Sequence, residues 1–432
     1  MSTTGPDLSK LIDQEHGLVY RSLYSDPAIY DLELEHIFAR CWLCLGHESL
    51  VPNPNDFITT YMGEDPVILW RNAEGKLGVY LNLCRHRGNR VCRLDRGNTN
   101  RFVCSYHGWV YNSDGKLIGV PYMKEGFMNE LDIEKWGLVP AAKVDVYKGL
   151  IFATFDNDAP PLEEYLGEAA WYLDVLLDWT AEGTEFIGGT RKWTIDCNWK
   201  TAAENFATDM AHVVHTHGAS VKVGLSRSHH MQQLARNAKG FTVYTKYGHG
   251  FTLMDIPDGL PIWDVQTKIE PFQRFLEETM PEATKRLGET RTKGITLVAA
   301  NIFPNLSFSF IDVTTARVWH PRGPGKIEAW EWTIVPKGLT PEAKEEMRHV
   351  GVYKWGPAGM FDQDDMDNWV QMTQSARGWA SRQVAMNYQM HIGDRGGVHE
   401  DLPGHVSALY SEENARLFYK HWLERVQPES RT

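Results

Sequence analysis

Two short segments of this 432-residue chain each carry one cysteine closely followed by one histidine. The first is Cys84-x-His86, and the second, after seventeen intervening residues, is Cys104-x2-His107. Two thiolates and two imidazoles suit either a tetrahedral Zn2+ or a [2Fe-2S] centre in which one iron keeps cysteine and the other takes histidine. Common zinc fingers present both cysteines before both histidines. Because each segment here carries one of each, two loops that clamp a binuclear iron–sulfur cluster are favoured, with a structural zinc site as the alternative.

Composition excludes several classes of function. The chain has 44 Lys and Arg against 56 Asp and Glu, and this net charge of -12 disfavours nucleic acid as a partner. No apolar run approaches the roughly 20 residues that cross a bilayer, and the N-terminus lacks the regions of a signal peptide. The four remaining cysteines are too sparse for a disulfide scaffold. We therefore expect a cytoplasmic protein.

Hydrophobic periodicity divides the chain into three parts. Asp26-Pro27 predicts a helix start, and apolar residues recur at helical spacing as far as Arg40. From Trp42 to about Asp156, short alternating runs between turn signals predict an all-β domain. Beyond a proline-rich break, strands and helices mix in an α+β domain. The expected limits are an N-terminal helical segment at 1–40 that packs on the last domain, the all-β domain at 41–157 and the α+β domain at 158–432.

The same patterns predict individual elements. Expected strands in the all-β domain are 57–61, 67–70, 78–82 and 150–155, with a hairpin of 109–111 and 117–118 around the turn Asn112 to Lys116. Expected strands in the α+β domain are 241–247, 306–311, 316–320 and 327–335. Expected helices are 162–179, 200–215, 271–287 and 341–355.

A second concentration of imidazole and carboxylate side chains follows the start of the α+β domain. On the helix expected there, Asn205, Asp209 and His212 fall on one face, whereas His217 misses that face unless the helix ends or bulges. Two histidines and one carboxylate form the facial triad that holds non-haem Fe(II) and leaves positions open for O2 and substrate. The acidic segment 359–369, embedded between aromatic residues, is the candidate source of the carboxylate.

Taken together, the two constellations resemble the catalytic α subunits of Rieske non-haem iron aromatic-ring-hydroxylating dioxygenases, from about Tyr20 to Trp422. The resemblance is closest to the naphthalene, biphenyl and phenylpropionate group. The family motif E-N-F-x2-D-x2-H-x4-H is matched from Glu204 to His217, and a D-D pair follows the Gly-Pro-Ala-Gly turn at 356–359.

The resemblance implies a fold and a set of ligands. The fold is α+β, with an all-β Rieske domain inserted after an N-terminal helix and a C-terminal catalytic domain built on an antiparallel, helix-grip, START-like sheet. Each subunit would carry one [2Fe-2S] cluster and one mononuclear Fe(II). The implied ligands are Cys84, His86, Cys104 and His107 for the cluster, and His212, His217 and Asp365 for the iron.

Two of the iron-ligand assignments have an alternative. Asp364 is the second candidate for the carboxylate ligand, and His215 could exchange with His217. The resemblance also implies catalytic roles for Asp209 and Asn205, with Asp209 hydrogen-bonded to His212 and, across a subunit interface, to His107.

The implied reaction adds both atoms of O2 to an arene and yields a cis-dihydrodiol. Electrons would come from NAD(P)H through a reductase and a ferredoxin, and the subunit would form α3 or, with a small β subunit, α3β3 assemblies. Residues that could line an apolar pocket are Phe206, Val213, Leu253, Phe308, Trp355 and Phe361. Such a lining favours a hydrocarbon or alkyl arene. The alternatives are a Rieske-type monooxygenase or demethylase acting on an aromatic acid, and an electron carrier or zinc-binding module without oxygenase activity.

Overall fold

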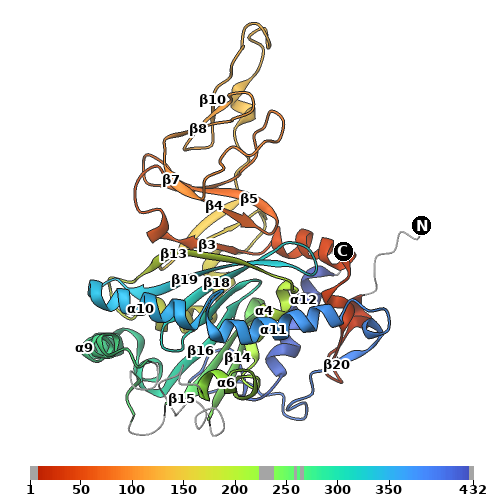
Figure 1. The fold of residues 1–432 in the computed structure, drawn as a ribbon, viewed down its shortest axis with the longest axis vertical. Coiled ribbons are helices and arrows are strands. Elements are labelled where there is room, and N and C mark those ends of the chain that lie inside the picture. The colour runs from red at the N-terminus through yellow and green to blue at the C-terminus, as the bar shows by residue number, and fades with distance from the viewer. Residues whose placement is uncertain (1–7, 223–237, 257–259, 263–266, 428–432) are drawn as a thin grey trace. The chain divides into compact units, whose positions relative to one another are not determined.

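The computed structural model describes residues 8–222, 238–256, 260–262 and 267–427 (Figure 1). The chain forms two compact units: the smaller comprises Phe38–Leu162, and the larger combines Met1–Ile37 with Glu163–Thr432. The domain limits expected from the sequence stay a prediction. Among the helices that the structure describes, none has both the length and the apolar character needed to cross a membrane.

The smaller unit is built from three antiparallel sheets. The four-stranded sheet has the order β6-β5-β4-β7, and the other two have the orders β10-β9-β8 and β11-β12-β3. The predicted hairpin is confirmed, because β9 and β10 pair around Asn112, whose side chain accepts the N–H groups of Asp114 and Lys116. The strands are β3 (Leu43–His47), β4 (Asp56–Met62), β5 (Asp65–Arg71), β6 (Leu77–Leu81), β7 (Arg96–Asn98), β8 (Arg101–Val103), β9 (Val110–Asn112), β10 (Leu117–Gly119), β11 (Lys143–Tyr147) and β12 (Leu150–Thr154).

One apolar core joins two sheets of the smaller unit, β6-β5-β4-β7 and β10-β9-β8, to its two Cys-His segments. The ring of Phe102 on β8 packs edge-on against Phe57 on β4 and lies 4.4 Å, centroid to centroid, from Trp70 on β5. Cys84 and Cys104 belong to the same buried cluster. The loops that carry the cysteines are therefore held against a packed β core.

The larger unit contains an eight-stranded antiparallel sheet, which confirms the expected α+β architecture. Its strand order is β13-β19-β18-β17-β16-β15-β14-β21, and a small sheet β1-β2-β20 lies apart from it. The strands are β1 (Ile12–Asp13), β2 (Leu18–Tyr20), β13 (Thr184–Ile195), β14 (Gly240–Thr245), β15 (His249–Asp255), β16 (Ile295–Ile302), β17 (Leu306–Ser309), β18 (Thr314–Pro321), β19 (Ile327–Pro336), β20 (Ala385–Asn387) and β21 (His405–Ala408).

Helices pack against this sheet and against one another. Helix α4 lies across β15 and β16, and α11 contacts both α4 and α10 (Figure 1). The α-helices are α1 (Pro27–Glu33), α2 (Leu162–Leu166), α3 (Ala169–Leu177), α4 (Trp199–Thr208), α5 (Val213–Thr216), α6 (Gly218–Lys222), α9 (Glu270–Leu287), α10 (Pro341–Lys354), α11 (Met360–Ser375) and α12 (Glu413–Val426). The short 3-10 and π helices are Leu8–Leu11, Arg21–Tyr24, Leu34–Phe38, Glu48–Leu50, Ile133–Trp136, Lys246–Gly248, Thr290–Gly294 and Ser381–Gln383.

A buried carboxylate attaches α1 to the larger unit. Asp26 caps α1 by accepting the N–H of Ala28, as the sequence predicted. Glu33, at the end of α1, is fully buried and forms an ion pair with the buried ammonium group of Lys200 on α4. The indole N–H groups of Trp199 and Trp422 also donate to Glu33, each at 2.8 Å. These contacts join α1 to α4 and α12.

Two of the predicted helices are interrupted. The helix predicted over 200–215 is wrong in its middle, because α4 ends at Thr208 and Asp209 adopts an extended conformation (φ -93°, ψ 93°). The carboxylate of Asp209 accepts the N–H of His212 at 3.1 Å, and such a side-chain bond competes with helical backbone bonds. The helix predicted over 162–179 is likewise divided at Gly167, whose φ of +47° is left-handed.

Glu204 on α4 lies in a buried cluster of tyrosines. Its carboxyl group accepts hydrogen bonds from Tyr388 at 3.1 Å and from Tyr419 at 2.5 Å. The hydroxyl of Tyr24 lies 2.5 Å from that of Tyr419. Burial raises the pKa of Glu204 to about 8, although the tyrosine hydrogen bonds oppose this rise. The folded protein therefore keeps a proton on Glu204 at pH values at which the unfolded chain has released it.

The raised pKa of Glu204 predicts a pH-dependent stability. Between its ordinary value of 4.5 and about 8, the folded state binds more protons at this group than the unfolded state, so the free energy of unfolding falls as pH rises. We expect Glu204→Gln to flatten this decline in denaturant titrations from pH 5 to pH 8. The matched control is Glu424→Gln, at an exposed position on α12, which should leave the slope unchanged. Equal slopes in wild type and Glu204→Gln would contradict the prediction.

Candidate metal centres

The two Cys-His segments of the smaller unit fold into equivalent turns. The N–H of Gly88 donates to the carbonyl of Cys84, and that of Gly108 to the carbonyl of Cys104, both at 2.9 Å. In each turn the N–H of the cysteine also donates to the carbonyl five residues further on, at 2.8 Å. Gly88 and Gly108 have φ values of +77° and +72°, where a side chain would cost energy. Each turn therefore presents one thiol and one imidazole, and the imidazole follows the cysteine by two residues in the first turn and by three in the second.

The four side chains fit a [2Fe-2S] cluster. Cys84 and Cys104 are each only 2% exposed, and both are free of disulfides. His86 and His107 are half-buried, with ring centroids 4.4 Å apart. The Nδ1 atom of His86 is buried and has no hydrogen-bond partner within the described part of the chain, so it is available to a metal. Two buried thiols beside two imidazoles are the donor set of a Rieske centre.

Neighbouring aromatic residues hold these ligands in place. The ring of His86 stacks on Trp109 with a centroid separation of 5.0 Å. The hydroxyl of Tyr111 lies 3.4 Å from the sulfur of Cys84 and accepts the N–H of Arg85. Burial lowers the pKa of His86, which favours the neutral imidazole that a metal requires.

The larger unit brings three further candidate ligands together. Ligand atoms of His212, His217 and Asp365 all lie within 4.8 Å of one another, and we call this group the triad. The Nε2 atoms of His212 and His217 lie 3.4 and 3.3 Å from Oδ1 of Asp365. His212 follows the break in α4, His217 ends α5, and Asp365 lies on α11. Two imidazoles and one carboxylate are the donor set of the non-haem Fe(II) facial triad.

The other nitrogen of each imidazole is held by a second group. The Nδ1 atom of His212 lies 3.5 Å from the carboxylate of Asp209 and 3.3 Å from the amide nitrogen of Asn205. The Nδ1 atom of His217 lies 3.3 Å from Asp364, which also accepts the hydroxyl proton of Ser220 at 2.6 Å. Such partners fix the orientation of a ligating imidazole. Each Nε2 atom is thereby left facing Asp365.

The structure separates the candidates that the sequence left open. Asp364 lies on the Nδ1 side of His217, whereas Asp365 lies on the Nε2 side of both histidines. His215 is exposed, whereas His217 is only 6% exposed. The geometry therefore groups Asp365 and His217 with His212, and it places Asp364 and His215 outside the group.

Electrostatics at the triad favour a cation. Burial alone would lower the pKa of His212, but the carboxylates of Asp209 and Asp365 raise it to about 10. Burial alone would raise the pKa of Asp365, but hydrogen bonds from the two histidines lower it to about 2. The surroundings thus stabilise positive charge between these groups, and a divalent metal would take the place of the protons.

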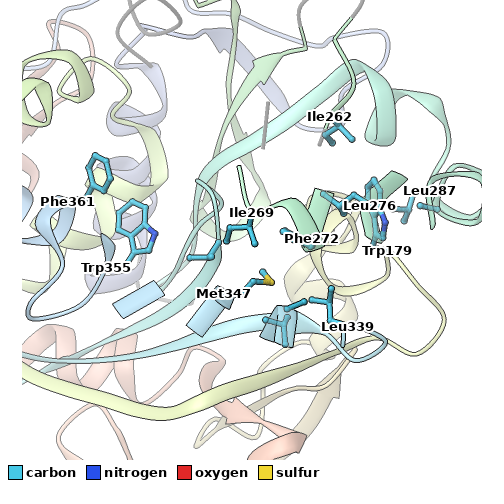
Figure 2. Packing of buried hydrophobic residues seen from close by; sticks show 14 residues of the cluster. Trp179, Ile262, Ile269, Phe272, Leu276, Leu287, Leu339, Met347, Trp355 and Phe361 are labelled. Carbon is cyan, nitrogen blue, oxygen red and sulfur yellow. The ribbon is translucent and has the colours of Figure 1, made fainter. Parts of the chain in front are cut away.

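A cavity of ≈ 40 Å³, which we call the triad cavity, opens beside these ligands. Of the pocket residues expected from the sequence, Phe206, Val213, Trp355 and Phe361 line it, together with Asn205. Figure 2 shows Trp355 and Phe361 near each other within a buried apolar cluster, and their ring centroids are 5.3 Å apart. Four of the six expected lining residues therefore meet at the triad.

Leu253 and Phe308 do not join this lining, because successive side chains of a strand point to opposite faces of a sheet. Both are fully buried, and their strand neighbours Thr252 and Ser309 line the cavity instead. The sequence predicted the strand that carries Phe308 but not β15, and in both strands a neighbour of the named residue lines the cavity. The lining residues that it did not name are Met210, Thr252, Val298, Ala299, Ser309 and Ile311.

Comparisons with known proteins agree with both centres. Residues 41–146 match the Rieske [2Fe-2S] domain, and residues 162–428 match the ring hydroxylating alpha subunit (catalytic domain). The chain is 42% identical to biphenyl dioxygenase subunit alpha of Paraburkholderia xenovorans (strain LB400), over 97% of this chain and 93% of that one. It is 41% identical to benzene 1,2-dioxygenase subunit alpha of Pseudomonas putida, with the same coverage. Naphthalene 1,2-dioxygenase with indole bound in the active site matches with a TM-score of 0.89 and 32% identity, over 98% of this chain and 94% of that one.

The fold and the two donor sets define a Rieske non-haem iron oxygenase. The chain belongs to the family of aromatic ring-hydroxylating dioxygenase alpha subunits, and it is a catalytic subunit that carries a Rieske cluster and a mononuclear iron. Alpha subunits of these multicomponent systems receive electrons through a ferredoxin and a reductase, and they often work with a β subunit.

The assignment of Asp365 predicts a selective loss of iron. Asp365→Ala removes the carboxylate oxygen that both Nε2 atoms face, so we expect the variant to lose most of its mononuclear iron while keeping the cluster. Iron and acid-labile sulfide per chain, together with the visible absorption of the cluster, measure the two centres separately. The matched control is Asp364→Asn, which leaves Asp365 in place and should retain more iron. Full iron retention in Asp365→Ala with loss in Asp364→Asn would reassign the ligand.

Proposed function

We propose that this subunit adds both atoms of O2 to adjacent carbons of an aromatic hydrocarbon or alkyl arene and releases a cis-dihydrodiol. The observation that carries this proposal is the lining of the triad cavity, which is largely apolar away from the metal ligands. No Lys or Arg is among the described residues that line it, so it offers an aromatic carboxylate no cationic partner. The names of the biphenyl and benzene dioxygenase relatives support the same class of substrate.

We assign roles to the residues of both centres. Cys84, His86, Cys104 and His107 would hold the cluster, and His212, His217 and Asp365 would hold the iron. The iron, when bound, supplies positions at which O2 binds and accepts electrons beside the substrate. Asp209 and Asn205 would keep the imidazole of His212 oriented, as Asp364 does for His217.

The apolar walls have a separate task. Phe206, Val213, Trp355 and Phe361 would hold the ring of the substrate against the open side of the triad and exclude water from it. Aromatic side chains pack well against an aromatic ligand because offset and edge-to-face ring contacts are favourable. We therefore expect these residues to determine which ring carbons react.

The proposed function also implies partner proteins and an assembly of several subunits. We propose α3 or α3β3 assemblies in which His107 of one subunit approaches Asp209 of its neighbour. In support, the side chain of Asp209 is 40% exposed even though it contacts His212, so one side of its carboxylate is open. Electrons from NAD(P)H would arrive through a reductase and a ferredoxin.

We also propose a cytoplasmic location, which is supported by six cysteines that form no disulfide. The proposed domains are 1–40, 41–157 and 158–432.

The proposed role of Asp209 predicts a defect in electron transfer between the centres. We expect Asp209→Asn to keep both metal centres but to lower the turnover rate by about 100-fold, at the upper end of effects for residues that contact metal ligands. In single-turnover experiments with the reduced enzyme, substrate-dependent oxidation of the cluster should slow by a similar factor. Normal turnover with full metal content would contradict this role.

Products labelled with 18O2 test the proposed reaction. The anaerobically purified protein, with a compatible ferredoxin and reductase, would be offered biphenyl, benzene, an alkylbenzene and benzoate. We expect a cis-dihydrodiol with two labelled oxygens from the hydrocarbons and little product from benzoate. A product with one labelled oxygen would identify a monooxygenase or demethylase, and a preference for benzoate would overturn the substrate class.

A further inference from the structure

A buried arginine lies directly behind two walls of the triad cavity. Arg317 on β18 is fully buried and does not line the cavity itself. Its guanidinium carbon lies 5.0 Å from the ring centroid of Phe206 and 4.9 Å from that of Trp355. A cation at this distance from an aromatic face is attracted by the ring quadrupole. The charge therefore lies over two rings that border the cavity.

The same guanidinium binds the helix that carries Asp365. One nitrogen, Nη2, donates to both carboxylate oxygens of Asp362, at 3.1 and 3.2 Å. Asp362 lies in the first turn of α11, three residues before Asp365, so the two side chains share a face of the helix. Asp362 also accepts the N–H of Gly356 at 2.6 Å, which fixes the residue that follows Trp355.

The other side of Arg317 is anchored in the sheet. Its Nε atom lies 2.8 Å from Oε2 of Glu331 on β19, and Glu331 forms a second ion pair with Arg191 on β13. Glu331 is the direct cross-strand partner of both arginines. Charges of alternating sign thus run from β13 through β19 and β18 to α11.

Stability alone explains this network poorly. Removing four charged groups from water is costly, and replacing buried ion pairs by apolar residues is often neutral or stabilising. The network does, however, connect a rigid sheet to Asp365 and to Trp355. Burial raises the pKa of Asp362, and Arg317 opposes that rise by stabilising the carboxylate that binds it.

We propose that Arg317 is a positioning residue, which holds Asp365 in ligating geometry and holds Phe206 and Trp355 as walls of the triad cavity. The proposal rests on the proposed function, because it takes Asp365 as an iron ligand. Lysine is not equivalent to arginine here, because the rigid guanidinium places Nη2 at Asp362 and Nε beside Glu331 at the same time. Loss of the bonds from Arg317 to Asp362 would let α11 shift slightly. That shift would weaken iron binding while leaving the fold intact.

Iron retention in matched variants tests the proposal. In Arg317→Lys we expect the mononuclear iron to leave at least about tenfold faster under a chelator, in the range for residues that orient metal ligands, while cluster absorption stays unchanged. Titration of the iron-depleted protein with Co2+ should show a matching loss of affinity. The control is Arg416→Lys: Arg416 is also buried and paired, with Glu413, and among the described residues its side chain donates to Glu413, Tyr388 and Met390, none of which lines the triad cavity. We expect Arg416→Lys to lower the unfolding temperature without changing iron retention.

Two further variants, Asp362→Asn and Asp365→Ala, test the positioning role and the ligand assignment independently of Arg317→Lys. Asp362→Asn preserves the shape of the side chain but weakens its bond to Arg317, so it should reproduce the iron loss even if Arg317→Lys does not fold. Normal iron retention in Arg317→Lys or Asp362→Asn, or equal iron loss in Arg416→Lys, would overturn the positioning role. Asp365→Ala tests separately whether Asp365 is an iron ligand. If it retains iron, the ligand assignment fails; if it loses iron while the Arg317 and Asp362 variants retain theirs, only the positioning role fails.

Discussion

The catalytic half of this protein depends on bringing two imidazole nitrogens and one carboxylate oxygen to within 4.8 Å. A continuous helix through this segment would leave His217 off the face that carries His212. The backbone therefore leaves the helix at Asp209, whose carboxylate accepts the N–H of His212 and also lies near its imidazole. One side chain thus ends α4 and contacts the imidazole of the candidate ligand His212.

Other parts of the larger unit hold Asp365, the third candidate ligand. Asp365 lies on α11, whose first turn is bound through Asp362 to Arg317 and thereby to the sheet. The sheet supplies the rigid frame, the segment around α5 carries the candidate ligands His212 and His217, and α11 carries Asp365. Alternation along β15 and β17 decides which of their side chains reach the cavity. In the smaller unit, two glycine turns perform the corresponding task for the cluster ligands.

The sequence was informative wherever a pattern is local. Fixed Cys-His spacing indicated the cluster, and alternation of apolar residues located ten of the 21 strands in the described residues, although it missed β13, β15 and β16 of the large sheet. It failed at Asp209, because helical periodicity continues past the residue at which a side-chain bond ends the helix. It failed at Leu253 and Phe308, because periodicity shows that alternate residues share a face but not which face meets the cavity. Arg317 gave no signal at all, since a charged residue in a strand becomes buried only through its cross-strand partners.

Anomalous X-ray diffraction at the iron absorption edge, on crystals of the anaerobically purified protein, would locate every iron atom. We expect three iron positions per chain: two between the turns that carry Cys84 and Cys104, and one between His212, His217 and Asp365. Iron coordinated by Asp364 or His215 instead, or zinc rather than iron between the cysteine turns, would contradict this expectation.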